Sequence, residues 1–165
     1  MRLRCVLLSA GVLLAESSVP KTLLPPPGEV LILHLNGKGN QIYTCQSAGG
    51  AHAWKLKAPD AKLFSESGEL AGRHFAGPAW EANDGSRVTG KVVASAPSSD
   101  SNSIPWLLLT VASHDGAGIM SGVQSIQRLE TKGGVAPATG CSAANENEET
   151  SVPYEAGYYF YGTSK

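Results

Sequence analysis

The sequence predicts an all-β protein, a sandwich or barrel of about eight to ten short strands with little helix. Short stretches rich in β-branched and aromatic residues alternate with turns of Gly, Pro, Ser and Asn along most of the chain. The chain has 19 glycines and 10 prolines, and no window before residue 69 keeps a 3.6-residue hydrophobic period. These observations favour strands joined by turns over packed helices.

Residues 1–18 have the composition of a signal peptide for export. Arg2 and Arg4 supply positive charge, the run CVLLSAGVLLA at residues 5–15 is a short apolar core, and small residues follow it. The alternative, a membrane anchor, needs about 18 apolar residues, and this run is shorter. We therefore predict cleavage near residue 18, a secreted protein in the extracellular space or the periplasm, and no membrane span.

The remainder is organised as a proline-rich lead-in at residues 19–28 and a single β domain at residues 29–165. Three successive prolines in KTLLPPPG favour extended geometry and cannot donate backbone hydrogen bonds. A stiff lead-in to the first strand explains them better than a ligand for a proline-binding domain. Without the leader about 147 residues remain, which is enough for one domain with a buried core.

The charge balance excludes one class of partner. Loss of Arg2, Arg4 and Glu16 with the leader changes the net charge from −1 to −2, and the chain has no basic run. A near-neutral protein of this kind has no electrostatic attraction for polyanions. We therefore expect no nucleic-acid partner.

The first half of the domain predicts several short strands. VLILHLNG at residues 30–37 and GNQIYTCQ at residues 39–46 are β-rich and separated by one residue, which predicts a hairpin with its turn at the glycines. AWKLKA at residues 53–58 alternates apolar residues with lysines, which predicts a strand with one buried and one solvent-exposed face. Pro59 should end this strand. Another short strand is expected at residues 60–68.

The second half continues in the same style. SRVTGKVVA at residues 86–94 predicts a strand, and APSSDSNS at residues 96–103 predicts a polar loop. WLLLTV at residues 106–111 is the most apolar run after the leader, and the turn residues around it favour a central buried strand. GVQSIQRLET at residues 122–131 is also assigned to a strand, although its apolar residues are spaced by three, as in a helix.

The chain closes with an acidic segment and an aromatic strand. NENEET at residues 145–150 predicts a solvated surface segment. VPYEAGYYFY at residues 152–161 is rich in aromatic residues, which strongly favour β-structure.

Two cysteines remain after removal of the leader, which also takes Cys5. Cys45 and Cys141 lie 96 positions apart, and an even number of cysteines in an exported chain predicts a disulfide. The bridge would tie the loop at residues 131–140 to the early strand. Two buried free thiols and a redox-active pair are the alternatives, and the second lacks the C-x-x-C spacing that lowers a thiol pKa.

Chemistry-bearing residues gather in GRHFAGPAWEANDGSRVTG at residues 72–90. His74, Glu81 and Asp84 are of types that bind metal ions or move protons, and Trp80 follows a Gly-Pro turn that could leave it partly exposed. These four residues are the predicted ligand-binding candidates. The structural alternative is a tight Asp-Gly turn, carboxylates that accept backbone hydrogen bonds, and packing of His74 against Trp80.

An enzyme is less strongly indicated than a binding or structural protein. No H-x-H, H-E-x-x-H or G-x-S-x-G motif is present, so we assign no metal ligand, no cofactor and no catalytic residue. A hydrolase could use a pair of carboxylates, either Glu81 with Asp84 or one of these with Glu66 or Glu69. Glycoside cleavage requires a set distance between the two carboxyl groups, and the sequence does not give that distance. A hydrolytic or metal-dependent enzyme around His74, Glu81 and Asp84 is the alternative.

Aromatic residues favour binding as the main class of function. Trp80 and the tyrosines of the last strand could stack on a flat ligand, whereas Trp54 and Trp106 lie in apolar strand contexts that favour the core. We therefore expect a secreted binding or structural module, with a carbohydrate or a small apolar molecule as the ligand and with its oligomeric state open.

The sequence resembles a known family over nearly the whole mature chain, residues 25–161. The resemblance is carried by the ordered motifs GNQIYTC, WKLKAPDAKL, HFAGPAWEANDGS, IPWLLL, IQRLETKGG and VPYEAGYYFY. That family consists of secreted bacterial and fungal proteins of unknown function, and some members carry a malate dehydrogenase label. The resemblance implies export and no catalytic residue. The residues do not support the dehydrogenase label, because no G-x-G-x-x-G lies between a strand and a helix.

Overall fold

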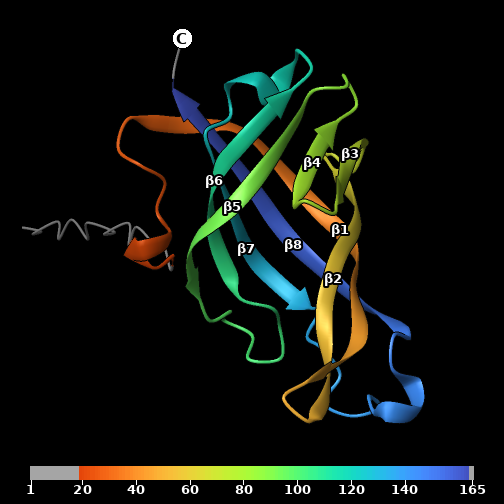
Figure 1. Ribbon diagram of the computed structural model, residues 1–165. Helices are drawn as coiled ribbons and strands as arrows, with labels where there is room; N and C mark the ends of the chain where they lie inside the picture. Colours follow the sequence, from red (N-terminus) through yellow and green to blue (C-terminus); the bar gives the residue numbers. More distant parts are fainter. Residues whose placement is uncertain (1–18, 164–165) are drawn as a thin grey trace, which may run out of the picture.

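The computed structural model describes residues 19–163, which form a closed antiparallel barrel of eight strands (Figure 1). Each strand pairs with its neighbours in chain order, and the last strand returns to pair with the first. The strands are β1 (Glu29–Ala48), β2 (Ala51–Phe64), β3 (Leu70–Phe75), β4 (Ala79–Ala82), β5 (Arg87–Ala96), β6 (Trp106–Asp115), β7 (Ser125–Gly133) and β8 (Glu149–Thr163). The predicted all-β fold is confirmed, and of the two expected architectures it is the barrel.

Helix is minor in the described part of the chain. It consists of the 3-10 helices η1 (Lys21–Leu23), η2 (Ile119–Gly122) and η3 (Ala143–Asn145). None of the helices in residues 19–163 has the length and the apolar composition needed to span a membrane. The predicted signal peptide at residues 1–18 lies outside the described residues.

The lead-in packs against the outside of the barrel. Leu23 of η1 is fully buried in a cluster with Trp106, Leu108 and Leu129 on the outer faces of β6 and β7. The side-chain Nε2 of Gln127 donates a hydrogen bond to the carbonyl oxygen of Leu23. The lead-in therefore covers an apolar patch of the sheet in addition to connecting to the first strand.

The two strands predicted at residues 30–46 are one continuous strand. β1 runs for 20 residues, so the predicted hairpin is wrong. A Cβ at Gly37 would lie 2.5 Å from Cε2 of Tyr158, and a Cβ at Gly39 would lie 2.2 Å from the carbonyl oxygen of Asp60. These glycines are therefore explained by close approach of neighbouring groups and not by a turn. With 15 residues in β8 as well, several strands are longer than expected.

β2 continues through Pro59 and joins the strands predicted at residues 53–58 and 60–68. Pro59 pairs with Gln41 of β1, close to a register shift, whereas the pairing of β2 with β3 begins only at Ala61. Proline is tolerated at such a position because one edge of the strand has no partner there. Leu56, which was expected on the buried face, is 56% exposed.

The strands predicted at residues 106–111 and 122–131 are confirmed as β6 and β7. In β6, Trp106 and Leu108 belong to the outer cluster, whereas Leu109 belongs to the interior core. In β7, Ile126 packs in the interior and Leu129 in the outer cluster. Both faces of these strands are covered, so their apolar residues need not alternate. The helical spacing in β7 follows from this two-sided burial.

The barrel interior has an aromatic centre. Trp80, Tyr158 and Phe160 are at most 1% exposed and meet at steep angles, with ring centroids 5.7 Å apart for Trp80 and Tyr158 and 6.4 Å apart for Trp80 and Phe160. A Cβ at Gly90 would lie 3.0 Å from Cζ3 of Trp80, so a glycine makes room for the indole. Met120 of η2 is fully buried in the same core.

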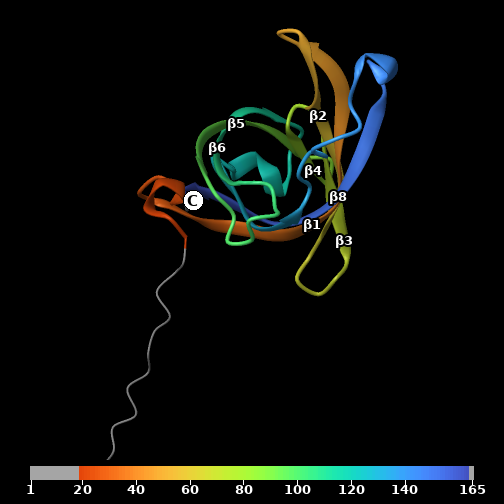
Figure 2. The ribbon, with the colours of Figure 1, turned by 90° about the horizontal axis from the view of Figure 1, so that it is seen from below.

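The far ends of β1 and β2 extend beyond the ring of strands as a hairpin (Figure 2). Cys45 of this hairpin is bonded to Cys141, which confirms the predicted disulfide. Trp54 also lies here, only partly buried, and its Nε1 donates a 2.9 Å hydrogen bond to the carbonyl oxygen of Thr139. Trp54 is therefore not part of the barrel core, contrary to expectation. The acidic segment at residues 145–150 is mostly exposed, as predicted.

Candidate functional site

A cavity of about 400 Å³ lies inside the barrel, beside an opening that the short β3–β4 hairpin leaves in the wall. β2 pairs with β3 only over residues 61–64, and β5 pairs with β4 only over residues 87–89. Below the hairpin, β2 and β5 therefore face each other across unpaired edges (Figure 1). Residues 56–59 of β2, Val92 of β5 and the Gly77-Pro78 turn all line the cavity.

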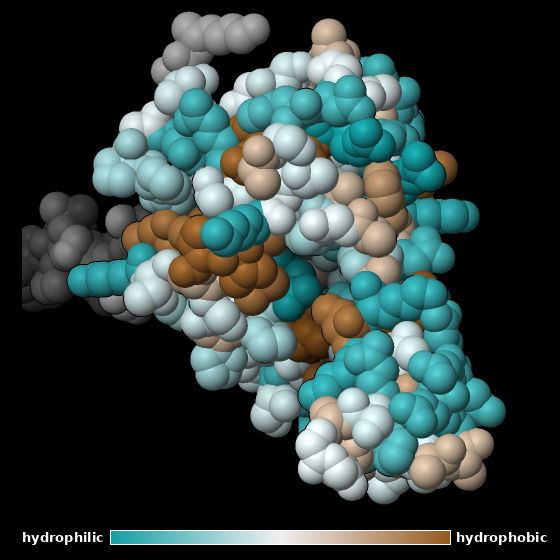
Figure 3. Space-filling view, viewed as in Figure 1, coloured by the Kyte–Doolittle hydropathy of each residue, from teal (hydrophilic) through white to brown (hydrophobic). Residues whose placement is uncertain are grey.

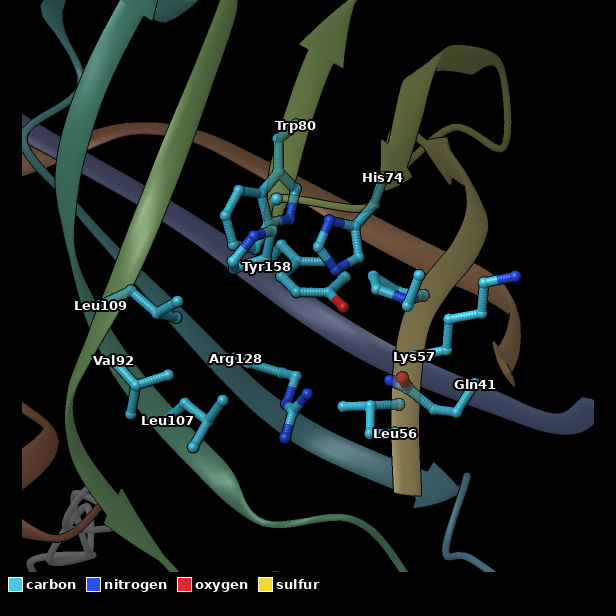
Figure 4. A pocket seen from close by; sticks show the side chains of 14 residues that line it. Gln41, Leu56, Lys57, His74, Trp80, Val92, Leu107, Leu109, Arg128 and Tyr158 are labelled. Carbon is cyan, nitrogen blue, oxygen red and sulfur yellow. The ribbon is translucent and has the colours of Figure 1, made fainter. Parts of the chain in front are cut away.

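Most of the cavity wall is apolar. The apolar side chains converge from both edges of the opening and from the barrel interior, as the close view in Figure 4 shows; they are Leu56, Trp80, Val92, Leu107, Leu109 and Tyr158. In the space-filling view, hydrophobic surface gathers in the middle of this face (Figure 3). The polar side chains of the lining come from Gln41, Lys57, His74 and Arg128. The cavity thus combines apolar walls with a few polar groups, as small-molecule sites do.

Arg128 brings a positive charge into the cavity. It lies two residues after Ile126 on β7 and therefore points into the barrel, on the same side of the sheet. Its Nε and Nη2 donate hydrogen bonds of 3.1 and 2.8 Å to the carbonyl oxygen of Pro105. Burial lowers the pKa of Arg128, and the electrostatic influence of the neighbouring tyrosines, Tyr158 first, opposes this change. A guanidinium nevertheless remains charged in proteins.

The tyrosines near Arg128 are neutral phenols. Tyr158 is fully buried, and burial raises its pKa well above the usual value. Its hydroxyl lies 2.9 Å from the hydroxyl of Tyr154, which is also buried and has a raised pKa for the same reason. The Tyr43 hydroxyl donates to the carbonyl oxygen of Gly134 at 2.5 Å. These residues therefore lie near Arg128 without supplying a negative charge.

His74 and Trp80 lie opposite each other on β3 and β4 and form the upper part of the cavity (Figure 4). Their rings stack with centroids 4.3 Å apart. His74 Nδ1 donates a 2.8 Å hydrogen bond to the carbonyl oxygen of Ala79, which fixes the tautomer with Nε2 as an acceptor. Burial lowers the pKa of His74 to about 3. The imidazole is therefore neutral near pH 7.

Trp80 differs from the sequence-based expectation in its exposure. It was predicted to be partly exposed beside a turn, but it is 1% exposed because its strand position points inward. Among residues 19–163, no hydrogen-bond partner is found for its buried Nε1 or for the buried Oε1 of Gln41. Both residues line the cavity, but these two atoms are themselves closed off from it, so other atoms of the two side chains form the wall.

The other two candidates lie outside the cavity. Glu81 follows Trp80 and points to the outer face, where it pairs with Arg73 at 2.9 Å and lies 4.0 Å from Arg87. Asp84 accepts hydrogen bonds from the hydroxyl and backbone nitrogen of Ser86 and from the backbone nitrogen of Ile119. These bonds, with the Ser86 hydroxyl first, lower the pKa of Asp84. Both carboxylates therefore have structural partners, and the four candidates do not form one site.

The aromatic residues of the last strand do not gather at one site either. In β8, Tyr154 and Tyr158 are buried in the interior, whereas Tyr159 packs with the outer cluster and stacks on His34 with centroids 4.1 Å apart. Alternation along the strand thus divides the tyrosines between two faces. They do not provide one stacking platform.

Sequence reasoning missed the residues that give the cavity its charge and shape, above all Arg128, Gln41 and Leu107. For Arg128 a signal existed, because it is a single charged residue between Ile126 and Leu129 in a strand that is buried on both faces. For Gln41 and Leu107 the sequence contains no such signal. They line the cavity because of the opening in the wall, and that opening depends on how far β3 and β4 extend.

No metal site is evident in the part of the chain that the structure describes. There, no group of three or more His, Cys, Asp or Glu side chains could hold a metal ion together. The carboxylates of Glu81 and Asp84 are held apart by their separate partners.

The fold and the cavity define this protein as a small eight-stranded antiparallel barrel with an internal pocket. The chain belongs to a family of unknown function: the family described as "Protein of unknown function (DUF3455)" matches residues 26–162. This match supports the resemblance to a family of unknown function that the sequence motifs indicated. A search of the curated proteins found no match, and a search of the solved structures found none either.

Proposed function

We propose that this protein binds a small, mostly apolar molecule inside its barrel. The observation that carries the proposal is the cavity of about 400 Å³ beside the unpaired edges of β2 and β5. Eight-stranded barrels are either filled by their own side chains or hold one small ligand. A volume of this size falls in the range of roughly 300–1,000 Å³ that is typical of ligand pockets.

Two residues of the cavity lining carry buried polar atoms without a hydrogen bond in the described part of the chain. A buried polar atom without a hydrogen bond destabilises a fold, and native proteins contain few of them. Within the described residues five such atoms occur, and two of them, Nε1 of Trp80 and Oε1 of Gln41, belong to residues that line the cavity. Both atoms are closed off from the cavity space, so a bound molecule would reach them only if the two side chains turned toward it.

The walls favour an apolar molecule over a carbohydrate. A sugar carries hydroxyl groups around its whole ring, and each buried hydroxyl needs a partner. Apolar side chains occupy most of the lining, including Leu56, Val92, Leu107 and Leu109. The few polar groups fit a ligand with one polar end.

We also propose that the protein acts outside the cytoplasm. The Cys45–Cys141 disulfide supports this, because structural disulfides persist in oxidising compartments and are rare in the cytosol.

Binding can be tested with the neutral fluorescent probe N-phenyl-1-naphthylamine. Its emission should rise on addition of the protein. Val92→Trp should weaken the affinity for the probe at least about tenfold, because a larger side chain at this position occupies the cavity mouth. Val93→Trp is the matched control, since Val93 is the next residue, is 57% exposed and does not line the cavity.

Two results would contradict the proposal. The first is an absence of probe binding to the wild-type protein. The second is an equal loss of affinity in Val92→Trp and Val93→Trp, which would place the probe on the outer surface. Circular dichroism of both variants shows whether the barrel is intact.

A further inference from the structure

Arg128 is a partly buried cation without an acidic partner within residues 19–163. Of the residues that the structure describes, the acidic side chains pair with Lys38, Lys57, Arg73, Arg87 and two histidines, but none pairs with Arg128. Its hydrogen-bond acceptor is the neutral backbone carbonyl of Pro105, and the neighbouring Tyr158 is neutral too. Removing a charge from water, even in part, is costly unless an opposite charge or hydrogen bonds compensate for it.

The guanidinium also has donors left over. A guanidinium carries five N–H groups. Two of them point to the carbonyl oxygen of Pro105. Three have no hydrogen bond of this kind to the described residues, and Figure 4 shows the guanidinium in the middle of the cavity, between Leu107 on one side and Leu56 on the other. The unused donors therefore face the space that a ligand would fill.

Lys57 is the other cation of the lining, but it has an acidic partner. Its Nζ is bonded to a carboxylate oxygen of Glu149, and its side chain is 55% exposed. His74 is neutral near pH 7 because of its burial. Arg128 is thus the charged group of the lining whose charge has no protein counterpart among the described residues.

We propose that the ligand is an amphipathic carboxylic acid whose carboxylate pairs with Arg128. This inference rests on the proposed function and identifies its ligand class. Guanidinium and carboxylate groups match in shape and can form two parallel hydrogen bonds, which makes arginine the preferred partner for a buried carboxylate. The apolar part of the molecule lies along Leu107, Leu109 and Trp80, which line the same cavity.

The volume limits the part of the ligand that the cavity can enclose. At about 30 Å³ for a water-sized group, a cavity of about 400 Å³ holds about thirteen non-hydrogen atoms. A straight-chain acid of about ten carbons, such as decanoate, has this size. A long-chain acid would have to protrude through the opening between β2 and β5.

The test is displacement of N-phenyl-1-naphthylamine by decanoate and by 1-decanol, both below the concentrations at which they aggregate. Decanol is the more apolar of the two, so unspecific apolar binding favours the alcohol. We expect wild-type protein to bind decanoate about tenfold to a hundredfold more tightly than decanol, which is the range for one charged hydrogen-bonded pair. This comparison needs no variant.

Variants then locate the charge that is responsible. Arg128→Met should lose the preference for decanoate and keep its affinity for the neutral probe and for decanol, whereas Arg128→Lys should keep part of the preference. Lys91→Met is the control, because Lys91 is an exposed cation on β5 that does not line the cavity. The control should keep the full preference.

The outcomes separate the two proposals. If the neutral probe does not bind to the wild-type protein, the proposed function is wrong. If the probe binds but decanoate competes no better than decanol, the cavity exists and the carboxylate inference is wrong. The inference is also wrong if Arg128→Met folds and still prefers decanoate, or if Lys91→Met loses the preference to the same extent.

Discussion

His74 should make the stability of the barrel depend on pH. Burial lowers the pKa of His74 to about 3 in the folded protein, while a histidine in an unfolded chain titrates near 6.5. Between these two values the unfolded state binds a proton that the folded state excludes. The contribution of His74 to stability is therefore complete above about pH 6.5 and decreases as the pH falls toward 3. Substitution by phenylalanine keeps an aromatic ring against Trp80 and removes the titration.

The size of the effect follows from the two pKa values. One proton changes the free energy of unfolding by about 1.4 kcal/mol per pH unit. Between pH 7.5 and pH 4.5 the wild-type protein should therefore lose about 2.7 kcal/mol through His74 alone. The loss in this window depends mainly on the unfolded pKa, so a folded pKa of 2 or 4 would change it little. His74→Phe should not show this loss.

Urea unfolding of both proteins at several pH values measures the difference. Asp84 and Asp100, which have lowered pKa values, titrate equally in both proteins and cancel in the comparison. His74→Gln also lacks the titrating ring and should give the same pH dependence as His74→Phe. If the curves of wild type and His74→Phe stay parallel from pH 7.5 to 4.5, the imidazole is not excluded from protonation and the reasoning is refuted.

Two further predictions concern the frame of the barrel. Replacing both Cys45 and Cys141 with alanine should lower the free energy of unfolding by up to about 4–5 kcal/mol, because a loop of nearly 100 residues is no longer closed in the unfolded chain; an unchanged urea midpoint would contradict this. Gly37→Ala should cost about 1–3 kcal/mol, since its Cβ would lie 2.5 Å from the ring of the fully buried Tyr158. Gly122→Ala, whose Cβ would lie 3.6 Å from the nearest atom, is the control, and equal losses in the two alanine variants would rule out the contact with Tyr158 as the cause.

The fold class could be predicted because strands and turns leave local signals. The apolar run at residues 106–111 and the aromatic run at residues 152–161 gave strands that the structure confirms. The positions at which strands end could not be predicted as well as their existence. Glycine and proline at positions 37, 39 and 59 have the same sequence signature as a turn, but here they are explained by close approach of neighbouring groups and by a half-paired edge. Which explanation holds depends on contacts between distant strands.

The opening of the cavity could not be predicted for a related reason. It exists because β3 and β4 are six and four residues long while β2 has 14 and β5 has 10. The unpaired remainder of β2 and β5 then borders the cavity. A sequence shows where strands end only through local residues, and the mismatch between neighbours appears only when their pairing is known.

The segment at residues 72–90 shows how strand geometry decides which neighbours act together. Trp80 and Glu81 are adjacent in sequence, but successive side chains of a strand point to opposite faces, so one lines the cavity and the other pairs with Arg73 outside. Arg128 is 48 positions after Trp80 and lines the same cavity, because β7 also turns this residue inward. The crowding of chemical groups in the sequence was therefore a weaker guide than the alternation within each strand. Under that rule, an unpaired charge on an inward position is the residue that most needs a ligand to explain it.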